Sequence, residues 1–291
     1  MAMTKNELLA AAASAFALAA FSSNAAAQSS VTLYGEVDAG LAYVNNVGGH
    51  SQYKMTTGTI DGSYWGLQGS EDLGAGNKAI FRLERGFSMA TGESLNDHPY
   101  YVGLGNDAFG TVTLGHQYDS VHDYLAPLTL TGGAGGTAFA HPFDNDNANN
   151  SWLARNAIKY TSPSFGGFSF GGMYALSNAA GAFANNRAYS IGANYQQGTL
   201  NIGAAWLHAN GRGNSDAGAY DAMTLPGADG SVFDANVRTQ NTYGVGASYG
   251  IGDVTVGAAW SRSTYTGVTD AASGSAAPSV GFSNYELNVV Y

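Results

Sequence analysis

The chain of 291 residues contains no cysteine. This absence excludes a disulfide scaffold, a cysteine-ligated metal site and thiol catalysis. Charged residues are 11% of the sequence, less than half of the roughly 25% in an ordinary soluble domain. Beyond the N-terminus, no run reaches the roughly 18 consecutive apolar residues that a transmembrane helix needs. The few basic residues and the formal net charge of -10 argue against nucleic-acid binding.

The N-terminus has the pattern of a secretory signal peptide. Lys5 is followed by the apolar, alanine-rich stretch Leu8–Phe21 and by three alanines, 25–27, that offer a cleavage site. A short buried helix is the alternative, but the stretch has no polar face. The sequence therefore predicts a signal peptide over residues 1–27 and a single domain over residues 28–291.

Glycine and tyrosine are abundant, at 41 and 18 residues, and they accompany strand-like alternation. Along residues 31–43, Val31 and Leu33 share one face, whereas Tyr34 and Glu36 share the other. Such alternation places one strand face in water and the other in an apolar environment. The apolar face would be the core of a soluble sandwich, or the lipid-facing surface of a membrane barrel.

This pattern recurs in about 12 predicted strands. They are Val31–Tyr43, Ser63–Glu71, Lys78–Ser88, Pro99–Gly105, Gly110–Tyr118, Arg155–Ser162, Gly167–Leu176, Arg187–Gln196, Thr199–Ala209, Thr239–Tyr249, Asp253–Thr264 and Phe282–Tyr291. Long and short connections alternate between them, and the short ones carry Gly, Asn, Asp or Pro, as tight turns require. A sandwich has no reason for this alternation. It predicts an all-β fold, a transmembrane antiparallel up-and-down β-barrel with long loops outside the cell.

One connection is much longer than the others, at about residues 119–154, and it has no strand alternation. It is rich in Gly, Asp and Asn. Loops of this length within a regular β pattern are usually functional. We interpret it as a third loop that folds into the barrel lumen and narrows a pore.

Several motifs occur in the order in which they occur in a known family. Residues 30–40 (SVTLYGEVDAG), 65–74 (WGLQGSEDLG), 78–84 (KAIFRLE), 101–104 (YVGL) and 110–115 (GTVTLG) resemble strands of proteobacterial general-diffusion porins, and residues 118–127 (YDSVHDYLAP) resemble the start of the constriction loop in that family. The resemblance covers essentially all of residues 28–291. It implies a homotrimer of water-filled channels in the outer membrane of a Gram-negative bacterium, in contact with membrane lipid and lipopolysaccharide. Ions and small hydrophilic solutes would diffuse through passively.

The resemblance includes one departure. Porins of this family have about 16 strands, an even number as antiparallel closure requires, and this chain would lack the last four. Either the chain is a C-terminally truncated porin, or it is a genuinely shorter barrel with a narrower lumen. Residues 282–291 alternate and end in an aromatic residue, as a terminal barrel strand does, but any lipid-facing strand looks similar.

Strand phase predicts which side chains face the lumen. Phe81 and Leu83 must face lipid, so Arg82 and Glu84 face inward, because a charge facing lipid costs roughly 2–4 kcal/mol near the midplane. By family resemblance, a basic cluster on the wall opposes acids on the loop. The candidate constriction residues are Glu36, Tyr64, Arg82, Glu84, His116, Asp119, Asp123, Asp144, Asp146, Arg155 and Lys159.

The basic side of this predicted constriction is thin. Tyr64, Gln68 and His116 stand where the family commonly has basic residues, and strict alternation from Leu114 turns His116 outward unless a bulge intervenes. Together with the net charge of -10, this predicts a pore that prefers cations.

Other functions are weighed against the channel. A barrel hydrolase needs a nucleophile, a base and an orienting group, and no such constellation is evident. Residues 144–150 begin like a calcium loop but lack its later ligands, so no metal site, cofactor or catalytic residue is predicted. The main alternative is a non-conducting outer-membrane barrel with an adhesive or structural role, which would have apolar inward residues.

Overall fold

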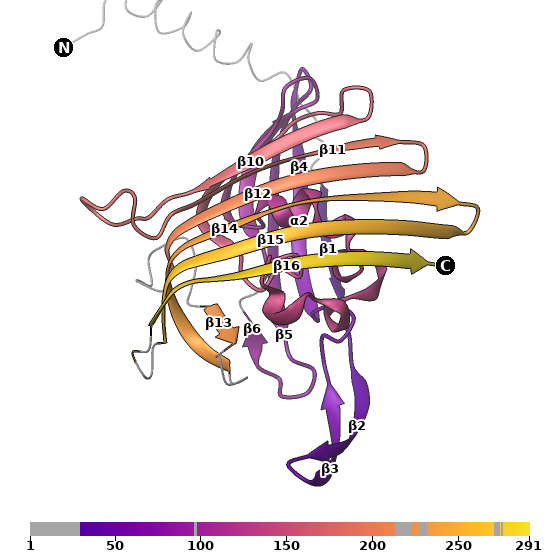
Figure 1. The fold of residues 1–291 in the computed structure, drawn as a ribbon. Coiled ribbons are helices and arrows are strands. Elements are labelled where there is room, and N and C mark those ends of the chain that lie inside the picture. Colours follow the sequence, from indigo (N-terminus) through magenta and orange to yellow (C-terminus); the bar gives the residue numbers. More distant parts are fainter. Residues whose placement is uncertain (1–29, 96–97, 213–222, 227–231, 271–273, 275) are drawn as a thin grey trace, which may run out of the picture.

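The computed structural model describes residues 30–95, 98–212, 223–226, 232–270, 274 and 276–291. The predicted signal peptide lies outside these residues. Twelve antiparallel strands follow one another along a single curved sheet (Figure 1). They are β1 (Ser30–Glu36), β4 (Tyr64–Gly74), β5 (Asn77–Phe87), β7 (Tyr100–Asn106), β8 (Gly110–Gln117), β9 (Ala154–Thr161), β10 (Phe168–Ala175), β11 (Ala188–Gln197), β12 (Leu200–Arg212), β14 (Val232–Ile251), β15 (Val254–Asp270) and β16 (Ala276–Val290).

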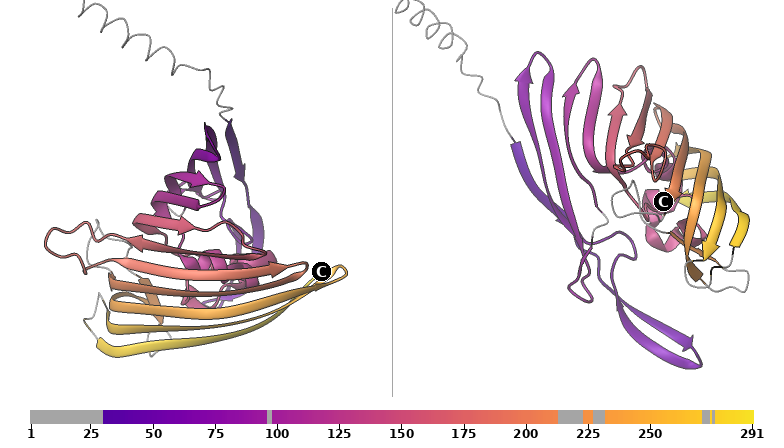
Figure 2. Two further views of the ribbon diagram at one scale, coloured as in Figure 1. Left: turned by 90° about the horizontal axis from the view of Figure 1, so that it is seen from above. Right: turned by 90° about the vertical axis from the view of Figure 1, so that its left-hand side faces the viewer.

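The up-and-down order of the strands confirms the predicted topology. Each strand pairs with its neighbour in this order, while β6 (Ser94–Leu95) and β13 (Met223–Pro226) add short pairings to β5 and β14. The turn at residues 74–76 has positive φ at all three positions, which the two glycines tolerate. β1 and β16 are the two ends of the path, and among the described residues no pairing joins them (Figure 2).

The first predicted strand is wrong beyond Glu36. The sheet strand β1 ends there, and the chain continues into a separate hairpin of β2 (Gly40–Val47) and β3 (His50–Thr56), which projects from one end of the sheet (Figure 1). Asp38 makes the break, because its carboxylate accepts the backbone N–H of Ile60 at 2.7 Å and its own N–H donates to Ser63 Oγ at 2.8 Å. Such side-chain bonds compete with the strand ladder.

The strands near the C-terminus are longer than predicted. β14, β15 and β16 span 20, 17 and 15 residues, and their pairing continues beyond the predicted strand ends into residues 235–239, 265–270 and 276–281. Polar residues such as Thr239, Thr266 and Thr269 continue the ladder there. Threonine favours strands through its branched side chain, although its polarity resembles that of a loop.

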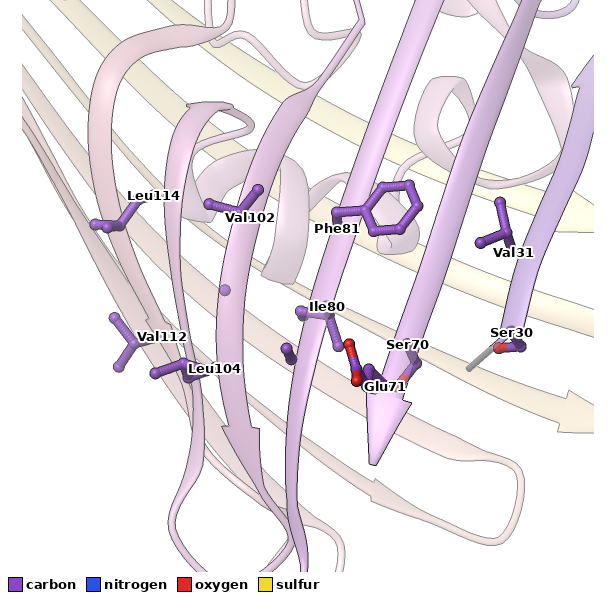
Figure 3. Close-up of a pocket in the computed structure, with 12 residues that line it drawn as sticks. Ser30, Val31, Ser70, Glu71, Ile80, Phe81, Val102, Leu104, Val112 and Leu114 are labelled. Atoms are coloured by element: carbon purple, nitrogen blue, oxygen red, sulfur yellow. The ribbon is translucent and has the colours of Figure 1, made fainter. Parts of the chain in front are cut away.

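The outward face of the sheet is apolar, as the alternation predicted. Leu33 is 71% exposed and Leu287 is 87% exposed, and both point away from the charged face. Figure 3 shows an apolar hollow lined by residues of β1, β4, β5, β7 and β8, among them Val31, Phe81, Val102 and Leu114 of this face. Among the described residues, no helix is long and apolar enough to span a membrane.

Candidate functional site: the constriction loop and the facing wall

The segment between β8 and β9 lies against the inward face of the sheet (Figure 1). It consists of α2 (Ser120–Tyr124) and four short turns of helix, η1 (Ala126–Leu128), η2 (Thr131–Gly135), η3 (Thr137–Phe139) and η4 (Pro142–Asp144). Val121, Tyr124 and Leu125 pack against Leu207 and small residues of β9–β12 in a buried apolar cluster. The inward-folded third loop is therefore confirmed, and this cluster lies between the loop and the wall.

Glycines on the inward face make room for α2. A Cβ atom added to Gly203 would lie 2.1 Å from the carbonyl oxygen of Tyr124, and one added to Gly192 would lie 2.4 Å from its ring. At Gly171 the same atom would lie 2.3 Å from the Tyr124 hydroxyl. A larger residue at any of these three positions would push the helix away from the wall.

Polar side chains of β15 and β16 anchor the far part of the loop. The Ser261 hydroxyl donates to the carboxylate of Asp146, and the Asn284 amide donates to the same carboxylate at 3.2 Å. Asn284 also donates to Asn145 Oδ1 at 2.9 Å, and the Tyr265 hydroxyl donates to the Asn145 carbonyl. These groups are buried, so a loop that left the wall would leave several polar groups without partners.

His141 lies between two carboxylates in the same anchor. Its Nδ1 is 2.8 Å from Asp146 Oδ2, and its Nε2 is 3.3 Å from Glu286 Oε2 on β16. Burial alone would lower the pKa of His141, but the hydrogen bond and charge of Asp146, followed by the charge of Glu286, raise it above its ordinary value. Glu286 Oε1 also accepts the backbone N–H of Leu130 at 2.6 Å. A protonated His141 therefore attracts both carboxylates, that of Asp146 on the loop and that of Glu286 on the wall.

Asp119 and Asp144 serve the internal structure of the loop. Asp119 caps α2 by accepting the N–H of Val121 at 2.6 Å, and it accepts the Asn147 amide at 2.7 Å. Its burial raises the pKa of Asp119 to about 6. The Asp144 carboxylate accepts backbone N–H groups of residues 149 and 151, and burial raises the pKa of Asp144 as well. Neither side chain is an open charge facing the wall.

Asp123 and Lys159 form a pair in which a predicted loop acid meets a predicted basic wall residue. Lys159 Nζ contacts Asp123 Oδ2 and also donates to the Tyr118 carbonyl at 3.1 Å. Burial alone would raise the pKa of Asp123, but Lys159 holds it below its ordinary value. The two charges neutralise each other by direct contact instead of facing each other across open water.

On the opposite wall, at β5, Glu84 lies at the centre of a cluster of hydrogen-bonded side chains. It is 1% exposed and accepts hydrogen bonds from Arg82 at 2.5 and 2.6 Å and from the Tyr34 hydroxyl. His98 Nδ1 lies 3.2 Å away, and the ring of Tyr64 lies 4.5 Å from the His98 ring. The structure thus brings three predicted residues together, Tyr64, Arg82 and Glu84, with the Arg82 charge compensated.

Glu36 and Arg155, two other candidate constriction residues, lie on β1 and β9. Glu36 pairs with Tyr64 across β1 and β4, where it is exposed on the inward face. Arg155 lies beside a local irregularity, because Asn156 has a φ of 55° and Ala154 and Ala157 are both buried against the loop. The simple alternation that placed Arg155 in phase with Lys159 does not hold across this irregularity.

The structure corrects one candidate. His116 pairs with Tyr100 across β7 and β8, and the two rings stack at 6.1 Å on the face that carries Leu114. The register shift on β8 comes only between Gly115 and the pairing of Gln117 with β9, so it does not turn His116 inward. His116 therefore lies outside the lumen.

Sequence reasoning missed His98, His141 and Glu286. Glu286 alternates with Tyr285 and Leu287 on the last strand, and this phase was a signal that it faces inward. His98 and His141 lie in connections, where no periodicity indicates direction. Only the fold shows that each contacts a wall carboxylate.

An apolar outer face, a charged inner face and a loop folded onto the inner wall define a transmembrane β-barrel of the channel type. The family comparison agrees: the model of the Gram-negative porin family matches residues 11–291, and the chain belongs to this family. It is an outer-membrane protein, as are its relatives.

An outer membrane porin of Bordetella pertussis is 32% identical and is matched over 89% of this chain and 70% of its own length. Outer membrane porin protein 32 of Delftia acidovorans is 38% identical over 56% of this chain, which spans 48% of that relative. Among solved structures, an anion-selective porin from Comamonas acidovorans matches with a TM-score of 0.65 and 25% identity, over 90% of this chain and 74% of the porin. The preference for cations predicted from the sequence has no support in these comparisons.

Proposed function

We propose that the chain forms a water-filled channel in the outer membrane through which ions and small hydrophilic solutes diffuse passively. The observation that carries the proposal is the loop of residues 118–153, seated on the inner face of β9–β12, with Glu36, Arg82 and Glu84 on the inner face of the opposite wall. Apolar residues outside and charged residues inside suit a lumen that contains water. A non-conducting barrel would have no need of charged inward residues.

The charge preference of this channel follows from how its charges are paired. Arg82 and Lys159 each contact a carboxylate, so the wall offers little uncompensated positive charge, whereas Glu36 adds a negative charge. We expect a modest preference for cations, weaker than the net charge of the chain suggests. The test is the reversal potential across a potassium chloride gradient, and a potential that favours chloride contradicts the expected preference.

Conduction itself is tested separately. The purified, refolded chain is added to planar bilayers and to liposomes that contain neutral sugars of graded size. We expect stepwise conductance and swelling that declines with sugar size. Stable insertion without conductance or swelling would support an adhesive or structural role instead.

We also propose, on the family resemblance alone, that the channel is a homotrimer in contact with outer-membrane lipid and lipopolysaccharide. Conductance steps that occur in threes, together with cross-linked trimers, are the expected result. Single conductance steps, together with only monomers after cross-linking, would contradict the trimer. No enzymatic step is part of this proposal.

A further inference from the structure

The tip of the constriction loop, residues 136–138, contacts the connection between β3 and β4. The backbone N–H groups of Thr137 and Ala138 donate to the carbonyls of Ile60 and Thr59, each at 3.2 Å. The rest of the loop is held on the other side of the lumen, where α2 lies on β10–β12 and the anchor lies on β15 and β16. The loop therefore crosses the lumen and is attached on both sides.

The two backbones at this contact approach so closely that no side chain fits between them. Gly136 is buried and has a φ of 71°, a conformation that glycine adopts without strain. A Cβ atom at this position would lie 1.9 Å from the Ile60 carbonyl oxygen. The side chain of Ile60 is 65% exposed, and that of Thr137 is exposed as well. The contact is therefore made by backbone, and its position depends on the course of the connection.

Asp38 fixes the course of this connection, which comprises residues 57–63. Its carboxylate accepts the backbone N–H of Ile60 at 2.7 Å and that of Asp61 at 3.4 Å. The Asp38 N–H donates to Ser63 Oγ at 2.8 Å, and the Asp38 carbonyl accepts the Ser63 hydroxyl at 3.1 Å. Because the connection lies between two strands, these bonds hold it where a strand ladder does not.

Ile60 joins the two contacts, since its N–H bonds to Asp38 and its carbonyl accepts the N–H of Thr137. Without the Asp38 carboxylate, the Ile60 N–H would bond to water, and the connection would sample other courses. The tip of the loop would then lose its partner, while α2 and the anchor would still hold the loop on the other side. A tip that is attached on one side only obstructs less of the lumen.

We propose that Asp38 is a positioning residue for the constriction. Acting through Ile60, it holds the tip of the loop against the side of the lumen that carries β1 and β4, and it thereby sets the size of the opening. This inference rests on the proposed channel function. Asp38 need not touch a passing solute, because its effect reaches the pore through two backbone groups of one residue.

Cross-linking tests the position of the tip directly. The chain contains no cysteine, so the double variant Ile60→Cys/Thr137→Cys carries only the two introduced thiols. A short bifunctional thiol reagent should join them rapidly in the folded chain in detergent. Adding Asp38→Ala should slow this reaction by about tenfold, because a hydrogen bond to a charged acceptor is lost. Asp38→Asn should retain most of the rate, since its amide oxygen also accepts the Ile60 N–H.

Conductance tests the consequence for the pore. Asp38→Ala should raise the single-channel conductance in planar bilayers and the size of the largest sugar that liposomes admit. Cross-linking residues 60 and 137 in this background should restore both quantities, and Asp38→Asn should conduct like the unaltered chain. Asp61→Ala is the matched control, because the exposed Asp61 carboxylate accepts the N–H of the neighbouring Gly62 at 2.7 Å. It removes the same charge and leaves the contact with the tip in place.

Four results would overturn the proposal. Unchanged cross-linking in Asp38→Ala would show that the tip does not depend on this carboxylate, and slower cross-linking with unchanged conductance would show that the tip does not set the opening. Asp38→Asn that behaves like Asp38→Ala would remove the hydrogen bond from the explanation. Equal changes in Asp61→Ala would assign the effect to charge at the mouth of the channel.

The two readouts also separate this inference from the proposed function. If the unaltered chain does not conduct, the channel function fails, whereas the cross-linking rates still decide whether Asp38 positions the tip. If Asp38→Ala does not fold, Gly136→Ala takes its place, because its Cβ atom separates the same two backbones. Gly136→Ala should cross-link more slowly and conduct more, and unchanged values would overturn the proposal.

Discussion

Replacement of Gly203 by alanine should displace the constriction loop. The new Cβ would lie 2.1 Å from the Tyr124 carbonyl oxygen and 2.9 Å from Leu128 Cδ1. Ordinary contact needs about 3.4 Å, so α2 must move by roughly 1 Å, and overpacking of this kind costs about 1–3 kcal/mol. Rotation of a side chain cannot relieve the clash with the carbonyl, because the atom belongs to the backbone of the helix.

The displaced helix has only the lumen to move into, so Gly203→Ala should lower single-channel conductance and the thermal unfolding temperature in detergent. Ala204→Val is the control, since Ala204 neighbours Gly203 but is exposed on the opposite face. We expect Ala204→Val to change neither quantity. The reasoning is refuted if Gly203→Ala conducts and unfolds like the unaltered chain, or if both variants change alike.

Three further perturbations test the electrostatics of the lumen. Glu84→Gln removes the carboxylate that compensates Arg82, so it should shift the reversal potential towards anions and destabilise the barrel by roughly 3 kcal/mol, as measured by equilibrium unfolding. Asp119→Ala should cost about 1 kcal/mol through loss of the cap on α2, whereas Asp119→Asn should be somewhat more stable than the unaltered chain at pH 7, because the amide can still cap and carries no buried charge. The advantage of Asn over Asp should disappear as the pH falls below the Asp119 pKa of about 6, where the acid is itself uncharged. Because the pKa of His141 is raised in the folded chain, its stabilisation is complete below its unfolded value near 6.5 and is lost as the pH rises through the folded value. Channel noise and the tendency to unfold should therefore increase at alkaline pH in the unaltered chain. His141→Gln should lose this pH dependence. A dependence that persists in His141→Gln would show that protonated His141 does not hold the loop.

The strand pattern carried most of the fold. Period-two alternation is local, and lipid on one side with water on the other makes it nearly obligatory, so β4, β5 and β7–β12 lie close to their predicted ranges. The alternation did not reveal that Asp38 ends β1, because that break depends on contacts with Ile60 and Ser63, about 25 residues away. Similarly, polar strands that extend beyond the membrane, as in β14 and β15, resemble loops in composition.

The candidate site was predicted less completely than the fold. Phase identified the facing direction of Arg82, Glu84 and Lys159 correctly, since neighbours on the strand supply the evidence. Alternation from Leu114 also predicted that His116 points outward. His116 was included among the candidates only because the family commonly has a basic residue at this position. The loop acids were a different case, because a sequence of Asp and Asn residues does not tell whether each carboxylate faces water or bonds to the loop backbone.

The sequence by itself determined the class of protein, the location of the long third loop and the division between lipid-facing and inward side chains, because these follow from periodicity, composition and the cost of charge in lipid. Only the tertiary structure decided which charges remain open. Asp123 meets Lys159 because the folded loop reaches β9, and Glu84 meets His98 and Tyr34 because a connection and another strand bring them to β5. Pairing depends on distances between separate segments, and the alternation of residues along one strand contains no such distances.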